Sequence, residues 1–245
     1  MDRKHFYATM NGEGTLDYER YLNTKALLSC QKDFTDFCNG DELQFQIVHQ
    51  VEELWMKLIG YTLLDIDDYL QQENTNRIVT LFGRTHTALR LMISQLALLE
   101  TMSPREYQEI RLRLGNGSGQ ESPGYRTLLK MPAHLWQSFQ TYYLDNHGLT
   151  VEKIYNTEYA HGDAYVVAEA MAEFDELFQR FRYCHVQLIQ RTIGLGSKSL
   201  KGRPVDRLIE GAHATFFPEL WDIRSQMTDG WGTQYGVVRD SLSAH

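Results

Sequence analysis

Cysteine is scarce in this 245-residue chain, and its few copies form no recognisable binding motif. Cys30, Cys38 and Cys184 include no Cys-x-x-Cys pair and no Cys-x-x-Cys-His haem-attachment motif. A small, odd number of cysteines is typical of a reducing compartment. We therefore expect a cytoplasmic protein that holds any prosthetic group without covalent bonds.

Basic charge and long apolar runs are also missing. Lysine and arginine number 24 against 32 acidic residues, and the net charge of -8 argues against a nucleic-acid surface. No apolar run approaches membrane-spanning length, and residues 1–14 lack the apolar block of a signal peptide. We expect a soluble protein with neither a nucleic-acid nor a membrane partner.

What the chain does have is helical periodicity, with 42% apolar residues to build a core. No strand pair with a convincing hairpin turn occurs, although residues 230–233 are compatible with a turn. The sequence predicts an all-α bundle forming one domain over residues 1–245. The expected helices cover residues 15–31, 42–70, 75–101, 103–114, 132–143 and 163–194, with a short last helix opening at 216–221.

The run from Asp163 to Gly194 places a histidine among apolar residues. Val167, Phe174 and Phe181 recur at helical spacing, and His185 falls on the same side. An imidazole in that position is either a hydrogen-bonded core residue or a metal ligand. The helix alone does not decide between them.

Two glycine-rich stretches interrupt the helices. Residues 115–124 hold four glycines and lead to Tyr125 and Arg126, and residues 195–204 form a second polar loop. Glycine usually marks a flexible connection, but it also lets backbone approach a ligand closely. Both uses fit these loops.

Two kinds of iron chemistry fit the histidines. Glu158 with His161, and Glu210 with His213, form Glu-x-x-His steps that can hold two iron ions in a helical bundle, although Gly162 and Gly211 weaken the helical interpretation. In a haem pocket, by contrast, His185 binds iron and His49 lies on the open face, four residues from Phe45. An ordinary solvated helix histidine is the alternative for His49.

Four segments together resemble the tryptophan 2,3-dioxygenase family, in the family's order and over most of the chain. The segment at 49–58 is the most specific, because its His-Gln-x-x-Glu-Leu-Trp-x-Lys-Leu pattern seldom arises by chance. The segments are Tyr18-Glu19-Arg20-Tyr21-Leu22, residues 49–58, Phe181-Arg182-Tyr183-Cys184-His185 and residues 216–224. The resemblance implies an all-helical protein, usually a homotetramer, that binds haem b without covalent bonds and uses O2 to oxygenate the indole ring of L-tryptophan.

The resemblance also implies roles for individual residues. His185 matches the family's haem ligand and His49 the histidine that meets the indole N–H, while Phe45 resembles the aromatic wall of the substrate pocket. Arg126 resembles the arginine that clamps the substrate carboxylate, a task that suits a planar guanidinium. Residues 1–30 are expected to contact a neighbouring subunit, with Tyr18, Tyr21 and Leu22 at that subunit's pocket; core packing is the alternative for these three.

Two departures from the family pattern bear on the substrate. The family's Gly-Thr-Gly-Gly-Ser-type loop is replaced here by residues 196–202, and Glu121, Pro123 and Gly124 change the approach to Arg126. The hypothesis from sequence is a haem-dependent oxygenase acting at C2–C3 of L-tryptophan or a substituted tryptophan. The alternatives are a reductant-dependent monooxygenase of a tryptophan derivative or another aromatic amino acid, and a non-enzymatic haem sensor.

Overall fold

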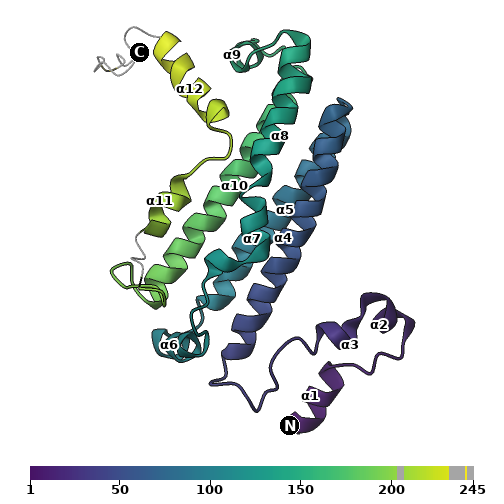
Figure 1. Ribbon diagram of the computed structural model, residues 1–245, viewed down its shortest axis with the longest axis vertical. Helices are drawn as coiled ribbons and strands as arrows, with labels where there is room; N and C mark the ends of the chain where they lie inside the picture. Colours follow the sequence, from purple (N-terminus) through teal and green to yellow (C-terminus); the bar gives the residue numbers. More distant parts are fainter. Residues whose placement is uncertain (203–206, 232–240, 242–245) are drawn as a thin grey trace.

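Long antiparallel helices make up the body of the protein, with shorter helical segments at both ends of the chain (Figure 1). The computed structural model describes residues 1–202, 207–231 and 241. These residues contain no β-strand, so the all-α prediction is confirmed. The elements are α1 (Arg3–Met10), α2 (Asp17–Leu22), α3 (Thr24–Leu27), α4 (Glu42–Gln71), α5 (Thr75–Leu99), α6 (Pro104–Arg113), η1 (Gly119–Glu121), α7 (Pro123–Leu128), α8 (Met131–Phe139), η2 (Gln140–Leu144), η3 (Asp145–His147), α9 (Val151–Tyr155), α10 (Asp163–Thr192), α11 (Arg207–His213) and α12 (Pro218–Trp231).

The core lies between α4, α5 and α10, which pack against one another along their lengths. Each helix buries one apolar stripe, and the strongest predicted helices are found within two residues of their expected ends. The side chain of Asn74 accepts a hydrogen bond from the backbone N–H of Arg77 at 3.3 Å, which caps the start of α5. The largest fully buried side chains include Leu63, Ile66, Leu81, Phe82, Leu89, Phe174 and Phe178.

The N-terminal segment differs from its prediction. The single helix expected over residues 15–31 is wrong: Asn23 adopts a left-handed conformation, with φ at 51°, and separates α2 from α3. Asparagine tolerates that conformation better than most residues, so it can end one helix and begin the next. None of the residues in α1, α2 and α3 is buried, and in Figure 1 this purple segment stands beside the foot of α4.

The helix predicted over residues 132–143 also changes character part-way. Regular α8 ends at Phe139, and η2 continues it as a π-helical stretch that contains Tyr143. Near the C-terminus, Gly230 and Trp231 of the predicted turn belong to α12, whereas residues 232 and 233 lie outside the described residues.

Two buried polar side chains of α10 hold the C-terminal helices in place. Asp175 is fully buried, and its Oδ2 accepts hydrogen bonds from the backbone N–H groups of Phe216 (2.8 Å) and Phe217 (3.1 Å) and from Trp221 Nε1 (2.9 Å). Arg182 donates to the carbonyl oxygens of Gly211 and Ala214, at 3.1 and 2.7 Å. Because both groups would be costly to bury alone, they define where α11 and α12 attach. No helix of the described part of the chain is long and apolar enough to cross a membrane.

Candidate functional site

His49 lies on α4 with a defined tautomer. Its Nδ1 is 2.7 Å from the carbonyl oxygen of Phe45, one turn earlier on the same helix. A carbonyl only accepts, so Nδ1 carries the proton and Nε2 keeps its lone pair. Burial lowers the pKa of His49, which favours the neutral ring. The side chain therefore presents a hydrogen-bond acceptor to any ligand beside it.

His185 lies on α10 near enough to His49 for the two rings to interact electrostatically. Burial, with a further contribution from His49, lowers the pKa of His185 to about 4. The half-buried imidazole is therefore neutral at pH 7, the form that binds a metal. Within residues 1–202 and 207–231 the His185 ring makes no hydrogen bond. Gly119 of η1 lies beside it, because a Cβ at Gly119 would be 3.7 Å from His185 Cε1. The alternative of a hydrogen-bonded core histidine does not describe this side chain.

An aromatic wall continues from His49 toward α6. The rings of Phe45 and His49 have centroids 4.1 Å apart, and Phe45 lies 6.3 Å from Tyr107. One turn beyond Tyr107, the half-buried Arg111 donates from Nη2 to the carbonyl oxygen of Lys198 at 2.5 Å. Burial raises the pKa of Tyr107, while the Arg111 guanidinium opposes the shift. Both residues are new to the site, and their four-residue spacing was the only sequence signal that they share a face.

Arg126 does not join this group in the single chain. It lies on α7 with an exposed side chain. The pKa of Glu121 is lowered first by its contact with Lys201, and the Arg126 guanidinium adds to that effect. Its assignment as a carboxylate clamp stays a prediction.

The two loops that depart from the family pattern are tied to each other. Lys201 forms an ion pair with Glu121, and the side chain of Glu121 also accepts a hydrogen bond from the backbone N–H of Ser118 at 3.2 Å. This contact holds residues 196–202 against η1, and the hydrogen bond from Arg111 to Lys198 holds them against α6. Gly119, the residue that meets His185, lies in that same turn. The glycine-rich loop is therefore placed against the candidate iron ligand.

The N-terminal residues expected at a neighbour's pocket are on the surface of their own chain. Tyr18 is 72% exposed, Tyr21 89% and Leu22 45%. Core packing within this chain, the alternative reading, does not apply to them. Their contact with another subunit stays a prediction.

Comparison with known proteins adds to this geometry. A sequence profile described as tryptophan 2,3-dioxygenase matches residues 4–133, more than half of the chain. The chain belongs to the tryptophan 2,3-dioxygenase family. It is 30% identical over 264 residues to the tryptophan 2,3-dioxygenase of Myxococcus xanthus (strain DK1622), covering 88% of this chain and 91% of that protein. It is 28% identical over 261 residues to that of Serratia proteamaculans (strain 568), covering 86% and 93% respectively.

The part matched by the family profile contains Phe45, His49, Tyr107 and Arg111, but it stops before His185. The assignment of His185 as the iron ligand therefore depends on the chemistry of its own side chain. It offers a neutral imidazole without a hydrogen-bond partner among the described residues, close enough to the neutral imidazole of His49 to feel its charge. These residues fit a haem: His185 would hold its iron, and His49 would offer a polar group to the substrate.

The di-iron alternative finds no support in this family member. Glu158 has a left-handed backbone, with φ at 41°, and lies in a turn, so the Glu158–His161 step is not helical. The ring of His161 instead stacks on Tyr165 at 3.9 Å. Across residues 1–202 and 207–231, no three His, Cys, Asp or Glu side chains come together as a metal site.

Proposed function

We propose that this protein is a haem-dependent L-tryptophan dioxygenase of the cytoplasm. The observation that carries the proposal is the pair of neutral imidazoles, one with a nitrogen free for iron and one with a nitrogen free to accept from an indole N–H. Its relatives from Serratia and Myxococcus bear the name tryptophan 2,3-dioxygenase. His185 would hold haem b, and ferrous haem, once bound, supplies the binding and activation of O2.

In this proposal His49 orients the substrate rather than deprotonating it. An indole N–H is a very weak acid, and a histidine whose pKa is lowered by burial is a poor match for removing its proton. Accepting a hydrogen bond at Nε2 does not require the imidazole to take up a proton, and it fixes the orientation of the indole ring. The C2–C3 bond would then be held at one place relative to the haem.

The remaining wall residues define the shape of the site. Phe45 and Tyr107 cover the indole side with aromatic surface and exclude water. The substrate carboxylate requires a cation, for which the sequence predicts Arg126. Arg111 is the second candidate, because it is half-buried and lies one turn from Tyr107, whereas Arg126 is exposed.

A homotetramer is part of the proposal. Residues 1–30 contain no buried side chain, so the segment with Tyr18, Tyr21 and Leu22 gains little from its own chain. Packing against a neighbour's pocket would cover these apolar side chains. Light scattering measures the assembly, and a fully active monomer would contradict it.

Labelled oxygen tests the reaction itself. The reduced, haem-loaded protein is incubated with L-tryptophan under ¹⁸O2, with and without added reductant, and the product is analysed by mass. A dioxygenase places two labelled atoms in an N-formylkynurenine and needs no stoichiometric reductant. One labelled atom with reductant consumed identifies a monooxygenase, and no product at all identifies a haem sensor. A substituted tryptophan used in preference to L-tryptophan would change the substrate but keep the reaction.

A further inference from the structure

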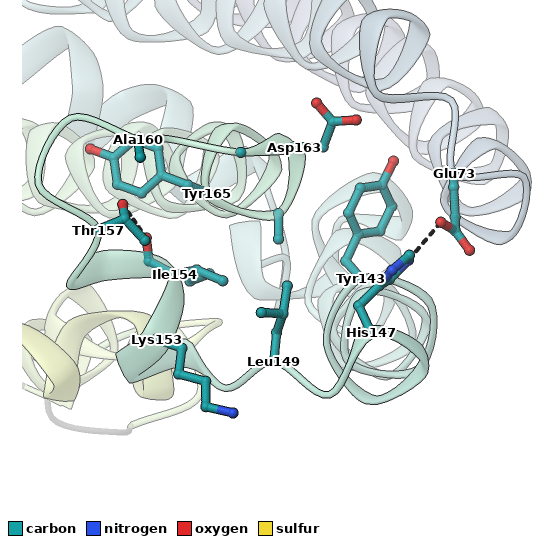
Figure 2. Close-up of a pocket in the computed structure, with 12 residues that line it drawn as sticks. Glu73, Tyr143, His147, Leu149, Lys153, Ile154, Thr157, Ala160, Asp163 and Tyr165 are labelled. Carbon is teal, nitrogen blue, oxygen red and sulfur yellow. Dashed lines mark hydrogen bonds and ion pairs between the residues drawn. The ribbon is translucent and has the colours of Figure 1, made fainter.

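A second cavity, of about 410 Å³, lies far from the histidine site (Figure 2). It is lined by Asp163 at the first turn of α10, whereas His185 lies near the other end of that helix. At 1.5 Å per residue, the two are separated by roughly 33 Å along the helix. The cavity therefore cannot be an extension of the proposed oxygenase site.

The backbone around this cavity is unusual in three separate segments. Glu73, which lines it, has φ at 51°, and the segment that brings Thr157 and Ala160 to its wall contains left-handed Glu158 and Tyr159. Tyr143 reaches it from the π-helical stretch η2. Strained non-glycine conformations and π-helical turns concentrate at functional sites, because packing alone does not call for them. The cavity is therefore framed by irregular segments rather than by continuous helices, which leaves space between them.

The polar end of the cavity is negative. The buried Tyr143 hydroxyl is 3.0 Å from Thr75 Oγ1, and burial together with the charges of Asp163 and Glu73 raises the pKa of Tyr143. Glu73 is paired with His147 at 2.7 Å, as Figure 2 shows. Asp163, in contrast, is exposed and has no hydrogen bond or ion pair within the described ranges, so its carboxylate is open to a ligand that enters from solvent. An anion placed beside Tyr143 would be repelled by both carboxylates.

The rest of the wall is apolar, apart from one lysine. In Figure 2, Leu149 lies between the polar end at Tyr143 and the opposite end of the cavity, where Ile154 and the ring of Tyr165 lie. Lys153 lines the cavity too, but its Nζ donates to the carbonyl oxygen of Gly148 at 2.9 Å and points away from Tyr143 in Figure 2. A ligand with one cationic end and a compact apolar body is complementary to this arrangement.

We propose that this cavity binds a small organic amine, with its ammonium group between the Asp163 carboxylate and the Tyr143 hydroxyl and its apolar body against Leu149 and Ile154. Asp163 supplies the charge, and the phenol oxygen accepts a second hydrogen bond from the ammonium group. The site is independent of the proposed oxygenase reaction.

The test uses 2-phenylethylamine and its neutral isostere 2-phenylethanol, titrated calorimetrically into the full-length, haem-loaded protein. The amine is expected to bind saturably at one site, and the alcohol to bind about fivefold more weakly, since it lacks the charge that the exposed Asp163 recognises. Asp163→Asn should weaken amine binding by a similar factor, and Tyr143→Phe by a smaller one. The control is Glu152→Gln, which removes an exposed carboxylate of α9 outside the cavity and should leave binding unchanged.

Four outcomes overturn the proposal: no saturable binding, equal affinity for amine and alcohol, unchanged binding in both cavity variants, or loss of amine binding in His49→Ala, which would assign the probe to the histidine site. Circular dichroism checks the fold of Asp163→Asn, since the change removes a favourable charge from the start of α10. If that variant is unfolded, the amine affinity of Tyr143→Phe tests the proposal instead. This variant should fold, because it keeps the aromatic ring whose centroid lies 5.8 Å from that of Phe139.

Discussion

The backbone N–H of Gly124 donates a hydrogen bond to Glu53 Oε2 at 3.0 Å, and this contact leaves no room for a side chain at position 124. A Cβ there would lie 2.7 Å from Met56 Cβ and 2.8 Å from Glu53 Oε2. Since α7 touches α4 at this point, any added atom must push the two helices apart. The glycine that departs from the family pattern thus has a packing role.

We expect Gly124→Ala to reduce the free energy of unfolding by about 1–3 kcal/mol, as overpacking does elsewhere. Urea denaturation measures it. Gly83→Ala is the matched control: nothing lies within 4 Å of a Cβ at that α5 position, so the same substitution should stabilise the protein by about 0.5–1 kcal/mol. Equal effects of the two substitutions would contradict the close approach.

His185→Ala is expected to abolish haem binding while helical content is retained, because the variant loses the imidazole proposed to bind the iron. Haem titration followed by absorbance measures binding, and circular dichroism measures the fold. His134→Ala, which changes an exposed histidine of α8, should bind haem normally. Normal stoichiometry with an unchanged spectrum in His185→Ala would overturn the assignment.

The same histidine makes the haem-free protein sensitive to acid. Its pKa falls from 6.5 in the unfolded chain to about 4 in the folded one, so between these values the unfolded state binds the extra proton. Stability is therefore full above the unfolded pKa and declines as pH falls. Between about pH 7 and about pH 5.5, wild type should lose about 1 kcal/mol more than His185→Gln. Parallel curves for the two proteins would show that His185 is solvated.

Binding of the substrate carboxylate distinguishes the two candidate arginines, Arg126 and Arg111. A charge-assisted pair with the substrate carboxylate contributes about 1.5–3 kcal/mol, so removing the clamp should weaken L-tryptophan binding about ten- to a hundredfold. We expect this of Arg126→Leu, the clamp predicted from sequence, with only partial rescue by lysine, whereas Arg111→Leu tests the half-buried second candidate. Tryptamine, which lacks the carboxylate, should bind alike to all variants. If Arg126→Leu alone loses the preference for L-tryptophan, Arg126 is the clamp.

Removal of the buried carboxylate of α10 should destabilise the C-terminal helices. Asp175→Ala leaves the N–H groups of Phe216, Phe217 and Trp221 without their acceptor, at an expected cost of about 3 kcal/mol. The neighbouring Glu176→Ala changes an exposed carboxylate and should cost about 0.5 kcal/mol or less. Urea denaturation compares them. A cost for Asp175→Ala no greater than for Glu176→Ala would refute the role.

Much of the fold follows from local sequence. The three long helices have uninterrupted apolar stripes, so periodicity alone locates them. The break at Asn23 was missed because a left-handed residue is tolerated there rather than demanded by the sequence.

The site is harder to predict than the fold. The spacing of Phe45 and His49 places them together, because both lie on one helix. The position of Arg111 beside residues 196–202, and the exposure of Arg126, depend on how α6 and α7 pack, which no local pattern encodes. The pairing of Glu121 with Lys201 likewise joins residues 80 positions apart.

The attachment of α12 to Asp175 also sets an order of assembly during synthesis. The carboxylate emerges from the ribosome 41 residues before the first of its C-terminal partners and 46 before the last. Until then Gln179, one turn later on α10, is its one local donor, at 3.2 Å from Oδ1, and Oδ2 has only water, although the helix already carries the apolar face that packs on α5. The C-terminal helices therefore attach last. They attach to a nascent bundle in which the Asp175 carboxylate still lacks its donors from α12 and the residues before it.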